Sequence, residues 1–447
     1  MTVDARSAPS PQVCWYGDDF TGATDTLAEV SRAGLRSLLF LGVPTPAQLR
    51  RAGPLDAIGI AGAARGMTPA EMEPELDTVG RFMASTGARV LHYKCCSTFD
   101  SAPHVGSIGA AVRTLRRHLP NPLVPIVGGQ PSIGRYCSFS QLFARAGAAP
   151  EIHRIDRHPV MSVHPVTPMH ESDLRLHLHA QGLSGIHAVP HIAYPTAADT
   201  PALDAWVDHL IDTTDGPLLL DLVDETQLAV IGRLIRRAAA RAPLLAVGPS
   251  SVQQALARAA TPAPGHGTQA APLGPAAGPV LVVAGSLSPV TARQIAACEH
   301  YVRQPLQVDR LRTDAAYAAE QAQLAAATLA RGSNVLAHTD KPSGPVSAQD
   351  TAATARATGR LVADIVQASG QAGRRLPRIG IAGGDTSSQA TLALGLWGLA
   401  YRCVLAPGVT VSVARSDDPL TDGIELMLKG GQMGGDRLFD QLATGKG

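Results

Sequence analysis

The sequence has little net charge, few aromatic residues, few cysteines and no long apolar run. The 38 lysines and arginines nearly cancel the 37 acidic residues, and the net charge of +1 creates no global field favouring nucleic acid or an anionic membrane. No stretch approaches the ~20 apolar residues of a membrane-spanning helix, and the polar start MTVDARSAPSPQ has no signal-peptide core. The six cysteines contain no CxxC motif, which argues against a disulfide scaffold. We therefore expect a cytoplasmic protein that binds small molecules and neither nucleic acid nor membrane.

What the chain does have is length and small residues. Its 447 residues exceed what one hydrophobic core usually organises, so two domains are expected. Hydrophobic residues make up 45% of the chain and aromatic residues only 4%, while glycine (44) and proline (34) are frequent. This composition is typical of a loop-rich α/β protein built on Ala, Leu and Val.

Short apolar runs alternate with helical patterns along the first part of the chain. The runs lie at residues 36–43, 55–62, 88–96, 122–129, 216–223 and 243–250. Their length, their flanking glycines and prolines and their lack of alternation predict strands buried on both faces of a parallel sheet. Residues 21–34 and 108–119 carry apolar side chains at helical spacing. Strands alternating with helices predict a layered α/β domain.

An Ala/Pro/Gly-rich segment at residues 259–279 predicts a linker between an N-terminal domain (1–258) and a C-terminal domain (280–447). Beyond it, a long Ala-rich helix is expected near 351–369, and further apolar runs lie at 278–286, 333–339, 378–388 and 401–414. We therefore predict an α/β fold of two domains, each a mainly parallel sheet flanked by helices, with a cleft between them.

The first candidate site is the turn GDDFTGATD at residues 17–25. It follows the predicted strand VCWY and precedes a predicted helix, which is where open α/β sheets bind ligands. Asp18 and Asp19 can accept hydrogen bonds from sugar hydroxyls or support a magnesium ion, and the first amides of the helix attract an anion. In the alternative interpretation one aspartate only caps the helix, but capping does not require a second, repelling carboxylate beside it.

Basic and hydroxyl residues follow other predicted strands of the first domain. Lys94 and Ser97 lie in KCCSTFDS, and Arg65 and Arg135 come after two further apolar runs. Guanidinium groups bind carboxylates through paired hydrogen bonds, so these residues are candidates for holding a polyhydroxy carboxylate. The alternative is that each arginine is a solvated loop residue.

Residues 154–182 are dense in histidine and proline. The histidines match neither the compact Cys/His spacing of a zinc site nor a pair at i and i+4 on one helix face, so we predict no metal site here. The X-Pro steps instead predict an extended loop that carries His164 toward a ligand, with Asp173 near the start of the next helix.

The second candidate site lies in the C-terminal domain, where GIAGGDTSSQATLALGL combines a strand, a Gly-Gly turn and a helix. Gly383 and Gly384 let the backbone approach a phosphate, and Asp385 and Thr386 open the helix, whose amino end attracts anions. No Walker-type motif is present. If this corner is considered by itself, the alternative to a phosphate-binding site is a glycine turn followed by a capped helix with no ligand.

Further flexible loops accompany this corner. Ser286 lies in AGSLSPVTARQI, Gly408 in the Pro-Gly loop APGVTV, and Lys429 and Gly431 in LKGGQMGGD. Several such loops and a lysine suit the phosphates of a nucleotide. The glycine-rich end is alternatively a flexible terminus, but the apolar IELML before it predicts a strand entering the turn.

The chain contains, in this order, the segments GDDFTGATD, KCCSTFDSAPHVGSIG, DRHPVMSVHPVTPM with ESDL, AGSLSPVTARQI, AGGDTSS and LKGGQMGG. Together these segments resemble the four-carbon acid sugar kinase family over nearly the whole chain. The resemblance implies a sugar-acid-binding N-terminal domain and a nucleotide-binding C-terminal domain. It places nucleotide contacts on Ser286, the Gly383 to Thr386 loop and Gly408, and the sugar-acid pocket on the loops holding Asp19, Arg65, Lys94 and Arg135. The sequence departs from the family where Ala284 replaces a serine and where CSFSQLFA replaces an aromatic-Gly-Asn run.

The resemblance implies an ATP-dependent kinase that phosphorylates the terminal 4-hydroxyl of a four-carbon acid such as D-threonate, erythronate or 3-oxo-tetronate in acid-sugar catabolism. Magnesium would bridge the phosphates. For the catalytic base we predict Asp385, since a carboxylate beside a phosphate-binding helix is placed to accept the hydroxyl proton, with Asp19 as the competing choice. A non-catalytic regulator that binds both ligands and an isomerase or aldolase acting on a phosphorylated sugar are the alternatives. A homodimer is the default expectation for the assembly.

Overall fold

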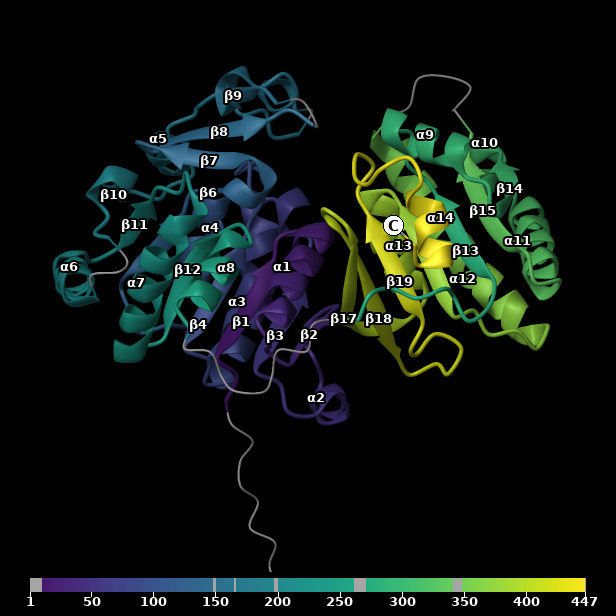
Figure 1. The fold of residues 1–447 in the computed structure, drawn as a ribbon, viewed down its shortest axis with the longest axis horizontal. Helices are drawn as coiled ribbons and strands as arrows, with labels where there is room; N and C mark the ends of the chain where they lie inside the picture. Colours follow the sequence, from purple (N-terminus) through teal and green to yellow (C-terminus); the bar gives the residue numbers. More distant parts are fainter. Residues whose placement is uncertain are drawn as a thin grey trace, which may run out of the picture. The chain divides into compact units, whose positions relative to one another are not determined.

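The computed structural model describes residues 10–147, 150–164, 166–196, 200–260, 271–340 and 348–446. The chain divides into two compact units, Met1–Gly267 and Thr268–Gly447. Part of the segment predicted as a linker, residues 261–270, lies outside the described residues. Both units are layered α/β structures, as the alternation of apolar runs and helical patterns predicts (Figure 1).

The first unit contains a parallel sheet with the strand order β10-β11-β5-β12-β4-β1-β3-β2. Its strands are β1 (Val13–Gly17), β2 (Ser37–Phe40), β3 (Ala57–Ala61), β4 (Val90–Lys94), β5 (Val124–Val127), β10 (His187–Val189), β11 (Pro217–Leu220) and β12 (Leu244–Gly248). Every residue of β1, β4 and β12 is buried, because helices cover both faces of the sheet. The six apolar runs predicted as strands all contain one, which confirms the predicted parallel sheet.

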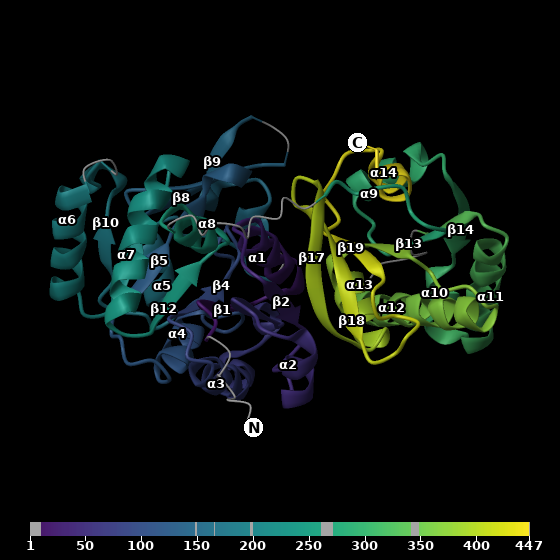
Figure 2. The ribbon, with the colours of Figure 1, turned by 60° about the horizontal axis from the view of Figure 1, so that its bottom comes forward.

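Helices cover the two faces of this sheet in separate groups. On one face, α7 packs against both α6 and α8, and α8 packs against α1; on the other, α3 packs against α4 (Figure 2). The helices of the unit are α1 (Phe20–Arg32), α2 (Pro46–Ala52), α3 (Pro69–Ser85), α4 (Ile108–Arg116), α5 (Leu174–Ala180), α6 (Thr200–Thr213), α7 (Leu228–Arg241) and α8 (Ser251–Arg258). Helices α1, α3, α4 and α7 bury apolar residues at helical spacing, as α1 does with Ala23, Leu27 and Val30, whereas α2 buries none.

A small antiparallel sheet, with strand order β6-β7-β8-β9, is added to the first unit. It consists of β6 (Gly129–Gln130), β7 (Arg135–Ser138), β8 (Gln141–Arg145) and β9 (Ile152–Arg154). The sequence analysis did not predict it. The region after it, expected to be an extended loop, contains short 3₁₀ turns at Ile155–Arg157 and Met161–Val163 before Asp173 caps α5. The extended-loop prediction is therefore wrong for these turns, and the predicted helix start near Asp173 is confirmed.

The second unit has a sheet with the order β17-β18-β19-β16-β13-β15-β14. Its strands are β13 (Val280–Ala284), β14 (Tyr301–Leu306), β15 (Asn334–Thr339), β16 (Arg378–Ala382), β17 (Leu396–Ala406), β18 (Val409–Ser416) and β19 (Glu425–Lys429). The strands from β19 to β14 pair in parallel, whereas β17, β18 and β19 pair antiparallel. The run at 401–414 is thus a hairpin of two strands, and the strand predicted from IELML is confirmed as β19.

Helices flank this sheet as well: α10, α11, α12 and α13 pack together on one face, and α9 packs with α14 (Figure 2). Their bounds are α9 (Pro289–Ala297), α10 (Val308–Thr313), α11 (Ala315–Ala330), α12 (Ala348–Gln371), α13 (Gly384–Ala393) and α14 (Leu438–Thr444). The predicted Ala-rich helix is α12. Among the residues that the structure describes, no helix has the length and apolar character needed to cross a membrane.

Candidate functional site

The polar turns of the first unit meet at one edge of its sheet because parallel strands end there in register. Gly17 at the end of β1 pairs with Ala61 of β3 and with Lys94 of β4, and Lys94 pairs in turn with Gly248 of β12. The chain leaves these strands through Asp18, the 3₁₀ turn Ala64–Gly66 and Cys95. This is the carboxyl edge, where open α/β sheets bind ligands.

At this edge the Arg65 guanidinium bridges the two adjacent aspartates. It donates to Asp18 Oδ1 at 2.8 Å and to Asp19 Oδ2 at 2.8 Å, while Asp19 Oδ1 caps α1 by accepting the Gly22 N–H at 2.7 Å. Burial raises the pKa of the Asp18 carboxyl, and the Arg65 guanidinium opposes that effect. The capping alternative therefore holds for Asp19, while Asp18, 3% exposed, has no such role.

Lys94 lies at the amino end of α1 beside the same aspartates. Its Nζ donates to the Cys95 carbonyl at 2.9 Å, and it lies 2.6 Å from where a Cβ on Gly22 would stand. Burial lowers the pKa of Lys94, but the attraction of Asp19, Asp18 and Asp25 outweighs it and the pKa is raised. The ammonium group is therefore charged, and with Arg65 it balances the charges of Asp18 and Asp19.

The remaining predicted residues of the first unit lie at varying positions. Ser97 is buried in the loop after β4, and Arg135 begins β7 with its Nη1 donating to the Ile133 carbonyl at 2.7 Å. The Arg135 Nε is buried and lacks a hydrogen-bond partner within the described residues, and burial lowers the pKa of this guanidinium. His164 turns into its own loop, where Nδ1 accepts the Thr167 N–H at 3.1 Å. No hydrogen bond between described residues joins His164 to Asp18, Asp19, Arg65 or Lys94.

A buried carboxylate that sequence reasoning missed holds the β7–β8 hairpin in place. Asp221, 1% exposed, accepts the backbone N–H of Ser140 at 3.0 Å and also that of Phe139. Both residues have positive φ, 50° for Phe139 and 67° for Ser140, a conformation unfavourable for non-glycine residues. The segment CSFSQLFA, where the sequence departs from the family pattern, thus depends on a carboxylate after β11 for its shape.

The second unit contains a cavity of about 280 Å³ at the carboxyl edge of its sheet. The strands there end in register, since Ala284 of β13 pairs with Ala382 of β16, which pairs with Lys429 of β19. The predicted residues that line the cavity are Ser286, Gly383, Gly384, Asp385, Thr386 and Gly431. The structure therefore brings together six of the eight residues predicted for nucleotide binding.

The Gly-Gly turn begins α13 in a form suited to an anion. Gly383 has φ of +124°, which side-chain-bearing residues rarely adopt, and its backbone N–H is held by the Lys429 carbonyl at 2.9 Å. Helix α13 starts at Gly384 without a side-chain cap, so the first amides of the helix have no capping side chain. Asp385 is exposed and Thr386 is buried in this first turn.

Lys429 does not line the cavity; it lies beneath the Gly431 turn. Its Nζ donates to Thr291 Oγ1 at 3.0 Å and lies 3.4 Å from the Gly431 carbonyl oxygen, which also accepts from Ser288 Oγ. The side chain is 1% exposed, and burial lowers its pKa to about 8. Lys429 therefore supports the turn and contributes its charge from behind it.

Gly408 also lies outside the cavity lining. It forms the turn of the β17–β18 hairpin with φ of +72°, and a Cβ there would stand 1.9 Å from Met433 Cε. The hairpin turn thus contacts the loop that follows β19.

Sequence reasoning missed several residues that line the cavity. The lining also includes Thr351, Thr354 and Ala355 near the start of α12, Thr339 at the end of β15, Val308 of α10, and Gly285 and Leu287 beside Ser286. Thr351 and Thr354 stand at i and i+3 of α12, so their hydroxyls share one face of the helix. That spacing is the sequence pattern from which their place in the cavity could have been predicted. Among the described residues, no group of three or more His, Cys, Asp or Glu side chains is arranged to hold a metal ion.

Comparisons with known proteins match both units. A family model described as a sugar-binding N-terminal domain matches residues 13–256, and one described as a nucleotide-binding C-terminal domain matches residues 281–439. The chain is 37% identical to a 3-oxo-isoapionate kinase of Paraburkholderia graminis, over 97% of this chain and 94% of the relative. It is 30% identical to a 3-oxo-tetronate kinase of Cupriavidus necator, over 97% of both chains.

Solved structures share the fold. A crystal structure from Salmonella typhimurium LT2 has a TM-score of 0.78 at 24% identity, covering 96% of this chain and 98% of the other. A Haemophilus influenzae protein has a TM-score of 0.73 at 23% identity, with the same coverage. The matched domains and the curated relatives together show that this chain belongs to the four-carbon acid sugar kinase family and is a sugar-acid kinase.

Proposed function

We propose that the protein transfers the γ-phosphoryl group of ATP to the terminal hydroxyl of a small 3-oxo sugar acid in acid-sugar catabolism. The observation that carries the proposal is the cavity of the second unit, where backbone amides, hydroxyls and one carboxylate surround a space of about 280 Å³. The names of the relatives favour 3-oxo acids as substrates: a 3-oxo-isoapionate kinase at 37% identity and 3-oxo-tetronate kinases at 30%.

In the second unit, the amino end of α13 and the turn at Gly383 and Gly384 bind the phosphates. Phosphates are favoured there because uncapped N–H groups and the helix dipole act together. Ser286 and Thr354, which line the same cavity, donate hydroxyl hydrogen bonds to the nucleotide. Lys429 keeps the Gly431 turn in place and adds positive charge behind the phosphates.

Magnesium suits this donor set, because the lining offers the Asp385 carboxylate and several hydroxyls, and Mg²⁺ prefers oxygen ligands together with substrate phosphates. Thr386 would hold it with the nucleotide, and Asp385 would be a ligand only if it is not the catalytic base. When bound, the ion neutralises charge that develops on the phosphates during transfer.

In the first unit, the sugar acid binds at the carboxyl edge. Because Arg65 already bridges Asp18 and Asp19, it orients these two carboxylates, which accept hydrogen bonds from the hydroxyls of the acid. The carboxylate of the acid is then bound by Lys94 and Arg135, the two other cationic residues predicted for this pocket. Ser97, buried in the loop that follows β4, contributes a hydroxyl.

The catalytic base is Asp385. It lies exposed in the first turn of α13, next to the proposed phosphate site, where a carboxylate can accept the proton of the attacking hydroxyl.

The test is an assay of ADP formation by the purified protein with ATP, magnesium and a panel of acids. The panel contains 3-oxo-isoapionate, the two enantiomers of 3-oxo-tetronate, D-threonate and erythronate. We expect acid-dependent ADP release and a phosphorylated product for one 3-oxo acid. Binding of ATP and an acid, seen as thermal stabilisation, without any product would instead identify a non-catalytic regulator.

A further inference from the structure

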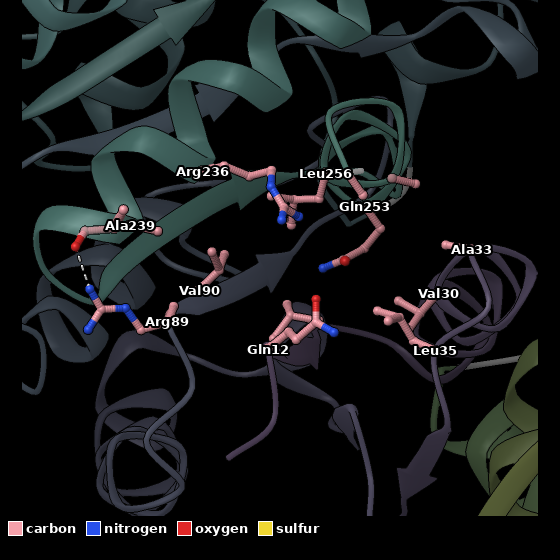
Figure 3. A pocket seen from close by; sticks show the side chains of 14 residues that line it. Gln12, Val30, Ala33, Leu35, Arg89, Val90, Arg236, Ala239, Gln253 and Leu256 are labelled. Carbon is pink, nitrogen blue, oxygen red and sulfur yellow. Dashed lines mark hydrogen bonds between the residues drawn. The ribbon is translucent and has the colours of Figure 1, made fainter. Parts of the chain in front are cut away.

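A second cavity in the first unit lies at the opposite edge of the sheet from Asp18 and Lys94. Its volume is about 320 Å³, at the lower end of the range for small-molecule sites. It is lined by Val13 and Val90, the first residues of β1 and β4, and by Val30, Ala239 and Leu256 from α1, α7 and α8 (Figure 3). These five side chains are all buried, so the floor of the cavity is apolar.

The polar residues around this apolar floor are two arginines and two glutamines, Arg89, Arg236, Gln12 and Gln253; among the described residues that line the cavity there is no aspartate or glutamate. Arg236 extends from α7 on the side of the cavity, with its guanidinium toward Leu256 and Gln253 (Figure 3). Arg89 donates to the Ala240 carbonyl at 2.7 Å. Neither arginine forms an ion pair with any residue that the structure describes.

The lack of an ion pair distinguishes Arg236 from the other arginines of α7. Arg233, Arg237 and Arg241 follow one another at four-residue spacing on α7 and pair with Asp204, Asp208 and Asp212 of α6. Arg236 is turned by about 100° around the helix from the middle of that row and forms no ion pair with the acidic residues of α6 that the structure describes. Helix α7 thus carries a row of ion-paired arginines and one solvent-exposed arginine without an ion pair, which lines the apolar cavity.

We propose that this cavity binds a small apolar carboxylate, whose apolar body occupies the floor and whose carboxylate pairs with Arg236. An apolar floor favours a hydrocarbon body, and guanidinium binds carboxylate with paired hydrogen bonds. A polyhydroxy acid is disfavoured, because its hydroxyls would lose water against Val13, Val30 and Val90 without gaining partners. The site is separate from both sites of the proposed kinase reaction and does not depend on that function.

The test uses three probes of matched structure: 3-phenylpropionate, 3-phenyl-1-propanol, which lacks the charge, and propionate, which lacks the ring. Isothermal titration calorimetry and saturation-transfer NMR on the full chain measure their binding. We expect saturable binding of 3-phenylpropionate with a dissociation constant of about 1 mM, and binding about tenfold weaker for each of the other probes.

Two variants and a control locate the site. Arg236→Gln should weaken 3-phenylpropionate about tenfold and leave 3-phenyl-1-propanol unchanged. Ala257→Phe, which places a ring into the cavity from the half-buried face of α8, should abolish binding of both ring-bearing probes, with thermal unfolding confirming that the variant folds. Arg233→Gln, on the ion-paired face of the same helix, should change neither affinity. Equal affinity of wild type and Arg236→Gln for 3-phenylpropionate would overturn the proposal, as would the absence of saturable binding to the wild type.

Discussion

The ammonium group of Lys429 donates a hydrogen bond to Thr291 Oγ1 at 3.0 Å, beneath the turn that lines the cavity of the second unit. No carboxylate contributes to the pKa of this lysine, which burial lowers to about 8. A lysine without an anionic partner that is nonetheless almost fully buried is costly for the fold by itself. An anion held at the Gly431 turn would offset that cost.

Lys429 should make the stability of the second unit depend on pH. Its pKa is about 8 in the folded protein and near 10.5 when unfolded, so between these values the unfolded state binds more protons. The free energy of unfolding contributed by this group therefore rises as pH increases from about 8 to 10.5, by about 1–3 kcal/mol. Urea unfolding of wild type and Lys429→Met at pH 7.5 and pH 10.5 measures this pH-dependent change in the free energy of unfolding. The gain should disappear in the variant; an identical pH response of both proteins would contradict the lowered pKa.

Arg65→Gln should destabilise the first unit. The change leaves the buried Asp18 carboxylate without the guanidinium that opposes its desolvation, which costs about 3 kcal/mol in the free energy of unfolding. Because the pKa of Asp18 then rises further, the loss should be larger at pH 8 than at pH 5. Chemical denaturation at the two pH values measures this difference.

The matched control is Arg36→Gln, which breaks an arginine–aspartate pair with Asp56 on the exposed surface of the same unit. Solvent screens that pair, so only a small change is expected. Comparable losses for Arg36→Gln and Arg65→Gln would show that the Asp18, Asp19 and Arg65 cluster has no special energetic role.

Gly384→Ala should separate nucleotide binding from folding. Gly384 lines the cavity, and no atom lies within 4 Å of the position that a Cβ would occupy, so the methyl group meets no protein atom. Alanine is the better helix former, and the unfolding free energy should rise by about 0.5 kcal/mol. ATP affinity, measured by calorimetry, should fall about tenfold because the methyl group keeps the phosphate from the backbone. Gly435→Ala, also in open space but outside the cavity lining, should leave ATP affinity unchanged.

The sequence made the parallel strands and the residues at their ends predictable for a physical reason. Strands buried on both faces, such as β1 and β13, must be continuously apolar, and the turn after each must lie at the carboxyl edge. That argument places Asp18, Lys94, Ser286 and Gly383 at the carboxyl edges of the two sheets without any knowledge of strand order.

Other features depend on contacts between distant residues and could not be predicted. The β7–β8 hairpin turns through Phe139 and Ser140 instead of glycine, and Asp221, about eighty residues later, holds that turn by accepting two N–H groups. Likewise, Thr339 and Thr354 line the same cavity as the Gly-Gly turn because of the order of the strands in the second sheet. The half-buried, polar pattern of the hairpin strands gave no signal of a second sheet.

Asp385→Asn should reduce turnover of the preferred acid by about 10²- to 10⁴-fold, because an amide cannot accept the hydroxyl proton. ATP affinity should change little, since the backbone of Gly383 and Gly384 and the hydroxyls of the cavity remain. Steady-state ADP release at saturating ATP, repeated over a range of magnesium concentrations, separates two roles. If Asp385 is the base, the substitution lowers kcat at every magnesium concentration. If Asp385 is instead a magnesium ligand, the substitution raises the magnesium concentration needed for turnover, and excess magnesium restores the rate. A wild-type rate for Asp385→Asn at ordinary magnesium would exclude both roles and return the base assignment to Asp19.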